Sequence, residues 1–185
     1  ETLPDGEIGL RTPPGGGRVS EEQSIVKLSD GSLYCVYRTV DGWPACAYSR
    51  DGGHTWTPPA YKAYTPGGRR VKHPRAANFA WNCSNGKFLY WFHNHGGRFI
   101  QAMPAGDRYA DRNPAWLMAG READTPQGKV IHWSQPEILL YDDDPVIRMS
   151  YPDLVEDGGK YYVTETQKNI GRVHEIPKPL LDGLF

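Results

Sequence analysis

The sequence is poor in cysteine, in long apolar runs and in excess charge of either sign. Its 185 residues contain three cysteines, Cys35, Cys46 and Cys83, an odd number without Cys-x-x-Cys spacing. This pattern argues against a disulfide framework and a zinc site, and favours small buried side chains. No apolar run approaches the roughly 20 residues that span a bilayer, and residues 1–6 lack the regions of a signal peptide. These absences give no reason to expect a membrane partner.

The charge balance excludes a further class of partner. Twenty-one basic and 22 acidic residues leave a formal net charge of -1, and the mean hydropathy is -0.63. Such a chain has no strong positive field to attract nucleic acid. What it does contain is 21 glycines, 16 prolines and 12% aromatic residues. Frequent turn residues between aromatic-rich apolar runs predict many short strands, and therefore an all-β fold.

Three segments share one plan and are predicted to be β-hairpins. Each has a short apolar run, a turn containing Asp-Gly or Asn-Gly, and a second run rich in aromatic or β-branched residues. The glycine supplies the positive φ angle that a tight hairpin turn requires. The segments are residues 24–37, 79–92 and 151–163.

A second repeated element indicates how these hairpins are combined. The run Trp56-Thr57-Pro58-Pro59 is echoed by Trp133-Ser134-Gln135-Pro136, which predicts radially arranged units, as in a β-propeller. Residues 60–70 and 103–129 are rich in turn-forming or charged residues and are expected to be long loops. At about 40–50 residues per unit, residues 1–185 hold about four blades. We expect them to be part of a six-bladed ring; a complete four-bladed ring or an open sandwich is the alternative.

Residues 49–56 fit the Asp-box pattern Ser-x-Asp-x-Gly-x-Thr-Trp at every defined position. The aspartate of such a turn can bind its own backbone, the glycine permits the reversal, and the tryptophan anchors the turn. The pattern resembles the Asp-box repeats of the sialidase superfamily, which includes enzymes and non-enzymatic propellers. It therefore indicates the fold and is nearly silent about function. Its five defined residues are Ser49, Asp51, Gly53, Thr55 and Trp56.

Two longer segments also resemble sialidases, and the remainder of the chain, including residues 134–137 and 173–176, is similar to bacterial sialidase-like proteins of unassigned substrate. Residues 21–38 are similar to the sialidase segment in which a glutamate precedes a hairpin that ends in an arginine. This resemblance implies that Glu22 activates a nucleophile and that Arg38 grips the substrate carboxylate. Residues 151–165 are similar to the segment that opens with the nucleophilic tyrosine, which implies that role for Tyr151.

The sialidase pattern is incomplete in this chain. The amino-terminal Arg-Ile-Pro segment and the catalytic aspartate that follows it are missing. If the chain is the carboxy-terminal portion of a longer propeller, both are expected to lie before residue 1. The missing portion, or a second chain, is then a partner. The resemblance favours a secreted or periplasmic location, although the sequence leaves the compartment open.

The implied residue types suit the chemistry of an acidic sugar. A neutral tyrosine avoids the repulsion that a carboxylate nucleophile would meet from the carboxylate of the substrate, but it needs a base. Arginine suits that carboxylate because its planar fork donates two parallel hydrogen bonds. Arg112 and Arg75 are further candidates for substrate binding. Each candidate also has a structural explanation, as a packed aromatic, a solvated acid or an ordinary cation.

Histidines form a competing constellation. His73 precedes the second hairpin, and His93 and His95 end it, so paired strands could bring them to one rim. Histidines beside arginine could remove the proton next to a uronic acid carboxylate, which is polysaccharide lyase chemistry. No carboxylate is spaced to complete a metal site with them, and no cofactor is expected.

Three functions follow from the sequence. The first is a sialidase-like, exo-acting glycoside hydrolase with a tyrosine nucleophile. The alternatives are a non-catalytic glycan-binding propeller and a histidine or tyrosine lyase that acts on uronic acids. In each case the partner is a carbohydrate. The sugar, its linkage and the acid that serves the leaving group stay open.

Overall fold

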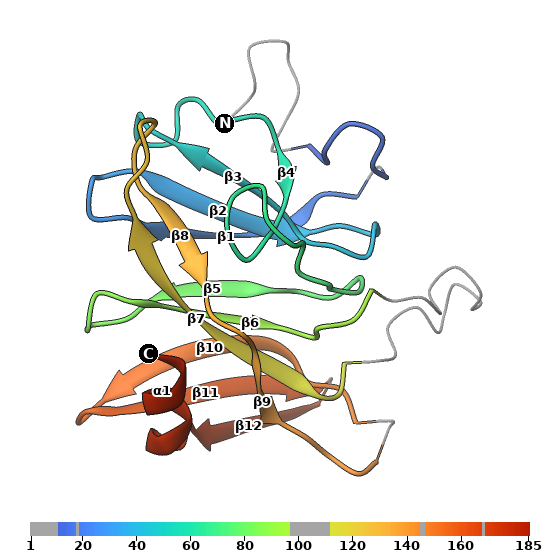
Figure 1. The fold of residues 1–185 in the computed structure, drawn as a ribbon. Coiled ribbons are helices and arrows are strands. Elements are labelled where there is room, and N and C mark those ends of the chain that lie inside the picture. The colour runs from blue at the N-terminus through green and yellow to red at the C-terminus, as the bar shows by residue number, and fades with distance from the viewer. Residues whose placement is uncertain (1–10, 18, 97–111, 145–146, 168) are drawn as a thin grey trace.

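The chain folds into three antiparallel sheets that lie one on another (Figure 1). A computed structural model describes residues 11–17, 19–96, 112–144, 147–167 and 169–185. No helix in these ranges is long and apolar enough to cross a membrane. The described residues therefore form a layered all-β structure, as predicted.

Each sheet is built mainly from strands that follow one another in the sequence. The first sheet contains β1 (Glu21–Lys27), β2 (Leu33–Arg38), β3 (Ala45–Ser49) and β4 (Ala60–Tyr61). The second contains β5 (Phe79–Asn82), β6 (Phe88–Phe92), β7 (Ala115–Ala123), β8 (Val130–Trp133) and β9 (Glu137–Leu140). The third contains β10 (Ser150–Asp157), β11 (Lys160–Gln167) and β12 (Ile170–Glu175).

All three predicted hairpins are present, and each opens one sheet. They are β1–β2, β5–β6 and β10–β11. In the first two turns Gly31 has φ 85° and Gly86 has φ 76°, the region of backbone space that glycine enters without cost. The turn chemistry read from the sequence thus places these strands correctly.

The expectation of a loop over residues 103–129 is wrong for its second half. Residues 115–123 form β7, which pairs with β6, β8 and β9, whereas residues 103–111 lie outside the described residues. Leu117 and Met118 point to opposite faces of the sheet, and both are buried. A strand buried on both faces lacks the apolar–polar alternation by which strands are recognised. The expected loop over 60–70 likewise begins with the short strand β4.

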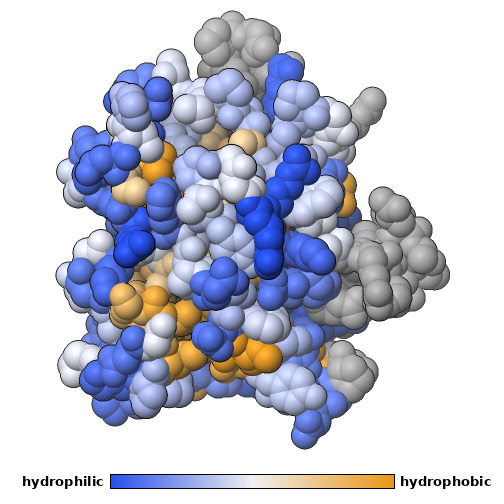
Figure 2. All heavy atoms as spheres, in the orientation of Figure 1, coloured by the Kyte–Doolittle hydropathy of each residue, from blue (hydrophilic) through white to orange (hydrophobic). Residues whose placement is uncertain are grey.

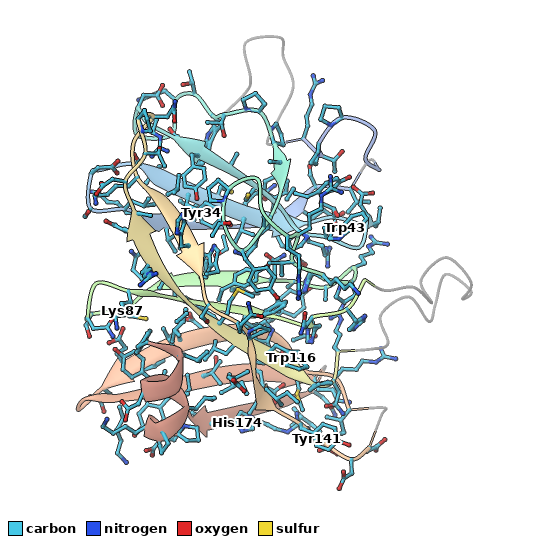
Figure 3. The ribbon with its side chains drawn as sticks, viewed as in Figure 1. Tyr34, Trp43, Lys87, Trp116, Tyr141 and His174 are labelled. Atoms are coloured by element: carbon cyan, nitrogen blue, oxygen red, sulfur yellow. The ribbon has the colours of Figure 1, made fainter. Side chains whose placement is uncertain are left out.

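Two hydrophobic clusters hold the sheets together. The first lies between sheets one and two and includes Tyr34 of β2, which is labelled in Figure 3. The ring of Tyr34 lies at a centroid distance of 6.1 Å from that of Trp133 of β8. The second lies between sheets two and three and includes Leu181 of the helix α1 (Lys178–Leu184). On the visible surface, hydrophobic residues gather mainly around α1 and β9 (Figure 2). The described residues form three packed sheets, fewer than the four blades that the length of the chain alone suggests.

The first strands of the three sheets are neighbours in space. β5 lies beside both β1 and β10, so the middle sheet separates the other two (Figure 1). Residues far apart in the sequence therefore meet where these strands begin. This end of the strands carries the candidate site.

Candidate active site

Glu22 and Tyr151 occupy matching positions on two different sheets. In β1, Glu21 pairs with Arg38 and Ser24 pairs with Val36, so two residues of β1 oppose one of β2. The bulge that results contains Glu22 and the residue after it. Bulges near the start of a strand commonly redirect a side chain out of the regular alternation.

The same irregularity recurs in β10. Ser150 pairs with Thr166 and Asp153 pairs with Thr164, which leaves Tyr151 and the following proline opposite a single residue of β11. Sheets one and three thus each present one side chain from the first position of a two-residue bulge. For sheet three this side chain is that of Tyr151.

Both residues have an unusual backbone conformation. Glu22 has φ 58° and Tyr151 has φ 48°. Residues with a Cβ atom rarely enter this region, at a cost of roughly 1–3 kcal/mol each. Such conformations persist only where the surrounding structure imposes them, and they gather at functional sites. The two bulges are therefore a physical indication of function that is separate from any resemblance.

The bulges bring the two side chains into contact. The Tyr151 hydroxyl donates a hydrogen bond of 2.9 Å to Glu22 Oε1. This bond raises the pKa of Tyr151, because the carboxylate stabilises the protonated phenol, and partial burial adds to the shift. Tyr151 remains 51% exposed, so its hydroxyl is accessible to a ligand. The distance lies within the range that we expect for a nucleophile and its base.

Arg38 holds the other side of Glu22. Its Nη1 lies 3.0 Å from Glu22 Oε2, and its Nη2 contacts Glu21 Oε2. The Arg38 side chain is only 9% exposed. The carboxylate of Glu22 thus bridges an arginine and a tyrosine, with one oxygen on each.

The two further predicted arginines lie in the same region. Arg75 Nη2 is 4.0 Å from Glu21 Oε2. Arg112 is buried, and its Nη1 donates a hydrogen bond of 2.7 Å to Ser150 Oγ, one residue before Tyr151. Burial lowers the pKa of Arg112, and the nearby charge of Arg38 lowers it further. The structure therefore places Arg38 on Glu22 itself, and Arg75 and Arg112 on the residues that precede Glu22 and Tyr151 in the sequence.

The charges of this region are unbalanced. Arg38, Arg75 and Arg112 contribute three positive charges, and Arg148, whose charge acts on Arg112, adds a fourth, whereas Glu21 and Glu22 contribute two negative ones. A ligand carboxylate would reduce this positive surplus. Arginine forks are the side chains that bind such a group most specifically. The site thus suits an anionic ligand.

Two of the three predicted histidines are buried side by side. His73 and His93 are each 1% exposed, and their rings stack at a centroid distance of 5.7 Å. His73 Nε2 donates to the carbonyl of Ala76 at 2.7 Å, and His93 Nδ1 donates to the carbonyl of Pro114 at 3.1 Å. Burial lowers the pKa of His93 to about 3 and that of His73 well below its ordinary value. Burial and bonds to backbone carbonyls make His73 and His93 neutral histidines of the core. His95 is more exposed than either.

The Asp box forms a compact turn between β3 and β4, away from the histidines. Asp51 accepts hydrogen bonds from the Thr55 amide at 2.9 Å and the Thr55 hydroxyl at 2.6 Å. These bonds lower the pKa of Asp51 to about 2. Ser49 Oγ accepts from the Gly53 amide at 2.8 Å, and Trp56 packs on a small buried cluster of the first sheet. Every polar group of the motif serves the turn itself.

Sequence reasoning overlooked two contributors to the site, Glu21 and Ser150. Glu21 contacts Arg38 and Arg75, and Ser150 accepts the bond from Arg112. The signal for Glu21 was its place at the first position of a hairpin whose other end is Arg38. No group of three potential metal ligands occurs in the described ranges.

The comparisons with known proteins concern the fold. No protein-family model and no curated protein matches the chain. An intramolecular trans-sialidase from Ruminococcus gnavus matches its structure with a TM-score of 0.62 and 18% identity, over 95% of this chain and 35% of the enzyme. A leech intramolecular trans-sialidase gives 0.62 and 19%, over 89% and 24%. An α-L-arabinofuranosidase from Fusarium graminearum gives 0.51 and 15%, over 91% and 48%. The chain thus has the fold of part of a sialidase-type β-propeller.

Proposed function

We propose that this chain supplies part of the active site of a glycoside hydrolase that removes acidic sugars, with Tyr151 as nucleophile and Glu22 as its base. The observation that carries the proposal is the 2.9 Å hydrogen bond between the Tyr151 hydroxyl and Glu22, formed by two strained bulges on separate sheets. A contact of this kind has no packing purpose that would offset the backbone cost on both strands.

The proposed step follows from the geometry. The Tyr151 oxygen attacks the anomeric carbon and its proton passes to Glu22, while the bond to the leaving oxygen breaks and that oxygen takes a proton from an acid that the proposal does not assign to this chain. A bond to a carboxylate favours the neutral phenol in the free protein, so the nucleophile is generated only as it attacks. Arg38, Arg75 and Arg112 hold the carboxylate of the sugar. Water then attacks the anomeric carbon and gives its proton to the same acid–base group, while the bond to Tyr151 breaks and Glu22 returns its proton to the phenolic oxygen.

The relatives by fold support a sugar as the substrate. The R. gnavus enzyme was solved with oseltamivir carboxylate, the leech enzyme with 2,7-anhydro-Neu5Ac and the F. graminearum enzyme with an iminosugar inhibitor. The positive surplus around Tyr151 favours the acidic ligands of the first two. Because the chain covers 35% of the R. gnavus enzyme, the proposal assigns to it only the nucleophile, its base and arginines of the clamp.

The test is the hydrolysis of an aryl sialoside by the full-length protein and its Tyr151→Phe variant. Loss of the hydroxyl should lower kcat/KM by at least on the order of a thousandfold, because removal of a nucleophile abolishes its pathway. Tyr141→Phe is the matched control, since Tyr141 is 65% exposed and lies outside the site. It should keep full activity.

The same experiment separates the alternative functions. A parent protein that binds sialosides without cleaving them would indicate a glycan-binding propeller. Cleavage of uronic acid polymers to unsaturated products, lost on replacement of His95 and kept in Tyr151→Phe, would indicate a lyase. Either result would refute the hydrolase proposal.

A further inference from the structure

The guanidinium fork of Arg38 is already occupied by the protein. Its Nη1 is 3.0 Å from Glu22, and its Nη2 contacts Glu21. A ligand carboxylate that binds Arg38 through either of these nitrogens must take the place of the glutamate that occupies it. One of the two glutamates must therefore give way before Arg38 can bind such a ligand.

The two glutamates are held differently. Glu22 bridges Arg38 and the Tyr151 hydroxyl, and its side chain is 22% exposed. Glu21 lies between Arg38 and Arg75, and its side chain is 44% exposed. The more exposed carboxylate is more easily displaced, because water screens its ion pairs and can replace them. Glu21 is thus the group that a ligand would replace.

We propose that Glu21 is a built-in competitor, whose carboxylate occupies the place between Arg38 and Arg75 that the carboxylate of the substrate takes. This inference rests on the proposed function. Binding is then an exchange of one carboxylate for another on the same pair of arginines. A neutral sugar offers no group to replace Glu21 and leaves its ion pairs intact. Glu21 therefore weakens the binding of ligands that place a carboxylate on this pair of arginines and leaves the binding of neutral ligands unchanged.

The opposite role for Glu21 is also physically reasonable and predicts the opposite result. If Glu21 only orients Arg38, its removal would leave the arginine poorly placed and would weaken binding of an acidic ligand. If Glu21 competes, its removal strengthens that binding. The sign of the change in affinity therefore distinguishes a competitor from an orienting group.

The test is calorimetric binding of 2,3-didehydro-N-acetylneuraminic acid to the full-length protein and to Glu21→Gln. We expect the variant to bind about fivefold more tightly, which corresponds to removal of an exposed ion pair. Glu175→Gln is the matched control, because Glu175, on β12, forms an exposed ion pair with Lys160 of β11, and the substitution removes one negative charge from that pair. It should leave the affinity unchanged. The methyl ester of the same ligand should show no gain in Glu21→Gln.

The outcomes separate this inference from the proposed function. Equal or weaker binding by Glu21→Gln overturns the competitor role, while sialoside hydrolysis by the parent would still uphold the hydrolase. A parent that neither hydrolyses sialosides nor binds this ligand refutes both. If Glu21→Gln is unstable, Glu21→Asp serves instead, because its carboxylate is one methylene shorter and lies farther from Arg38. Tighter binding in that variant supports the inference, and weaker binding overturns it.

Discussion

Lys62 is a lysine without access to solvent, and its protonation state can be derived from its surroundings. The side chain is 0% exposed, and its Nζ is buried without a hydrogen-bond partner in the described structure. It lies 3.7 Å from the ring centroid of Trp133 and 4.4 Å from that of Tyr90. Burial lowers the pKa of Lys62 well below 10.5.

Two physical effects oppose each other at this position. Contact with aromatic faces favours the charged ammonium by about 2 kcal/mol when the pair is desolvated. Removal of an ammonium from water costs several times as much, even after relaxation, on the order of 5 kcal/mol or more. Desolvation is therefore the larger effect, and we expect a neutral amine in the folded protein near neutral pH.

A neutral buried lysine makes stability depend on pH in a known direction. Between the lowered pKa of the folded state and 10.5, the unfolded chain binds one more proton than the folded chain. The free energy of unfolding therefore rises with pH in this window, by about 1.4 kcal/mol per unit. The free energy of unfolding correspondingly falls as the pH decreases through this window. The variant Lys62→Met lacks this slope, and at pH 7 it should be more stable by about 5 kcal/mol, which is about 1.4 kcal/mol for each pH unit between 7 and 10.5.

The assay is urea unfolding of the full-length protein and of Lys62→Met at several pH values between 7 and 10. The difference between the two proteins removes groups that ionise alike in both, such as Cys35 and Cys83, and leaves Lys62 together with Cys46, whose charge is coupled to it. The stability advantage of the methionine variant should shrink as the pH rises. A difference that stays constant with pH would show that Lys62 keeps its charge, and would refute the reasoning about desolvation.

Two further predictions concern the site and the sheet packing. Glu22→Gln should lower the pKa of Tyr151, because it removes the carboxylate that raises this pKa and leaves Arg38 in place. Phenolate absorbance as a function of pH, with the titration of Tyr151→Phe subtracted, measures the pKa. An unchanged value would contradict the contact. Gly120→Ala should cost about 1–3 kcal/mol of unfolding free energy by overpacking, because its Cβ would lie 2.6 Å from Ile131 Cγ2. Gly171→Ala, which meets open space, is its control in the same denaturant titration, and equal midpoints would count against the packing described.

The parts of the fold that follow from local chemistry were predictable. Asp30-Gly31 and Asn85-Gly86 specify tight turns by their backbone preferences, so the hairpins around them could be located from sequence. β7 could not, because both of its faces are buried and its residues follow a segment rich in glycine, proline and charge. Its recognition depends on pairing with three strands, of which β6 lies well before it in the sequence.

The candidate site was predictable to a smaller extent. Glu22, Arg38 and Tyr151 were found by resemblance, and nothing in their local sequence specifies a contact across 129 positions. The burial of His73 and His93 was not foreseen, because histidine is as common on surfaces as in cores. What decides their state is burial, which depends on the packing of the folded chain around both rings. The proposed role of Glu21 likewise depends on the approach of Arg75 from the loop that precedes β5.

The Tyr151–Glu22 contact joins the first sheet to the third, and the second sheet lies between them (Figure 1). That middle layer therefore acts as a spacer whose thickness is set by the side chains on its two faces. Trp91 and Tyr90, neighbours on β6, are both fully buried and point to opposite sides of it. A larger or smaller residue at either position changes the separation of the outer layers, and a hydrogen bond tolerates only a few tenths of an ångström. Substitutions of these core residues would thus change the length of the Tyr151–Glu22 hydrogen bond and slow the proposed reaction, although neither residue belongs to the reacting groups.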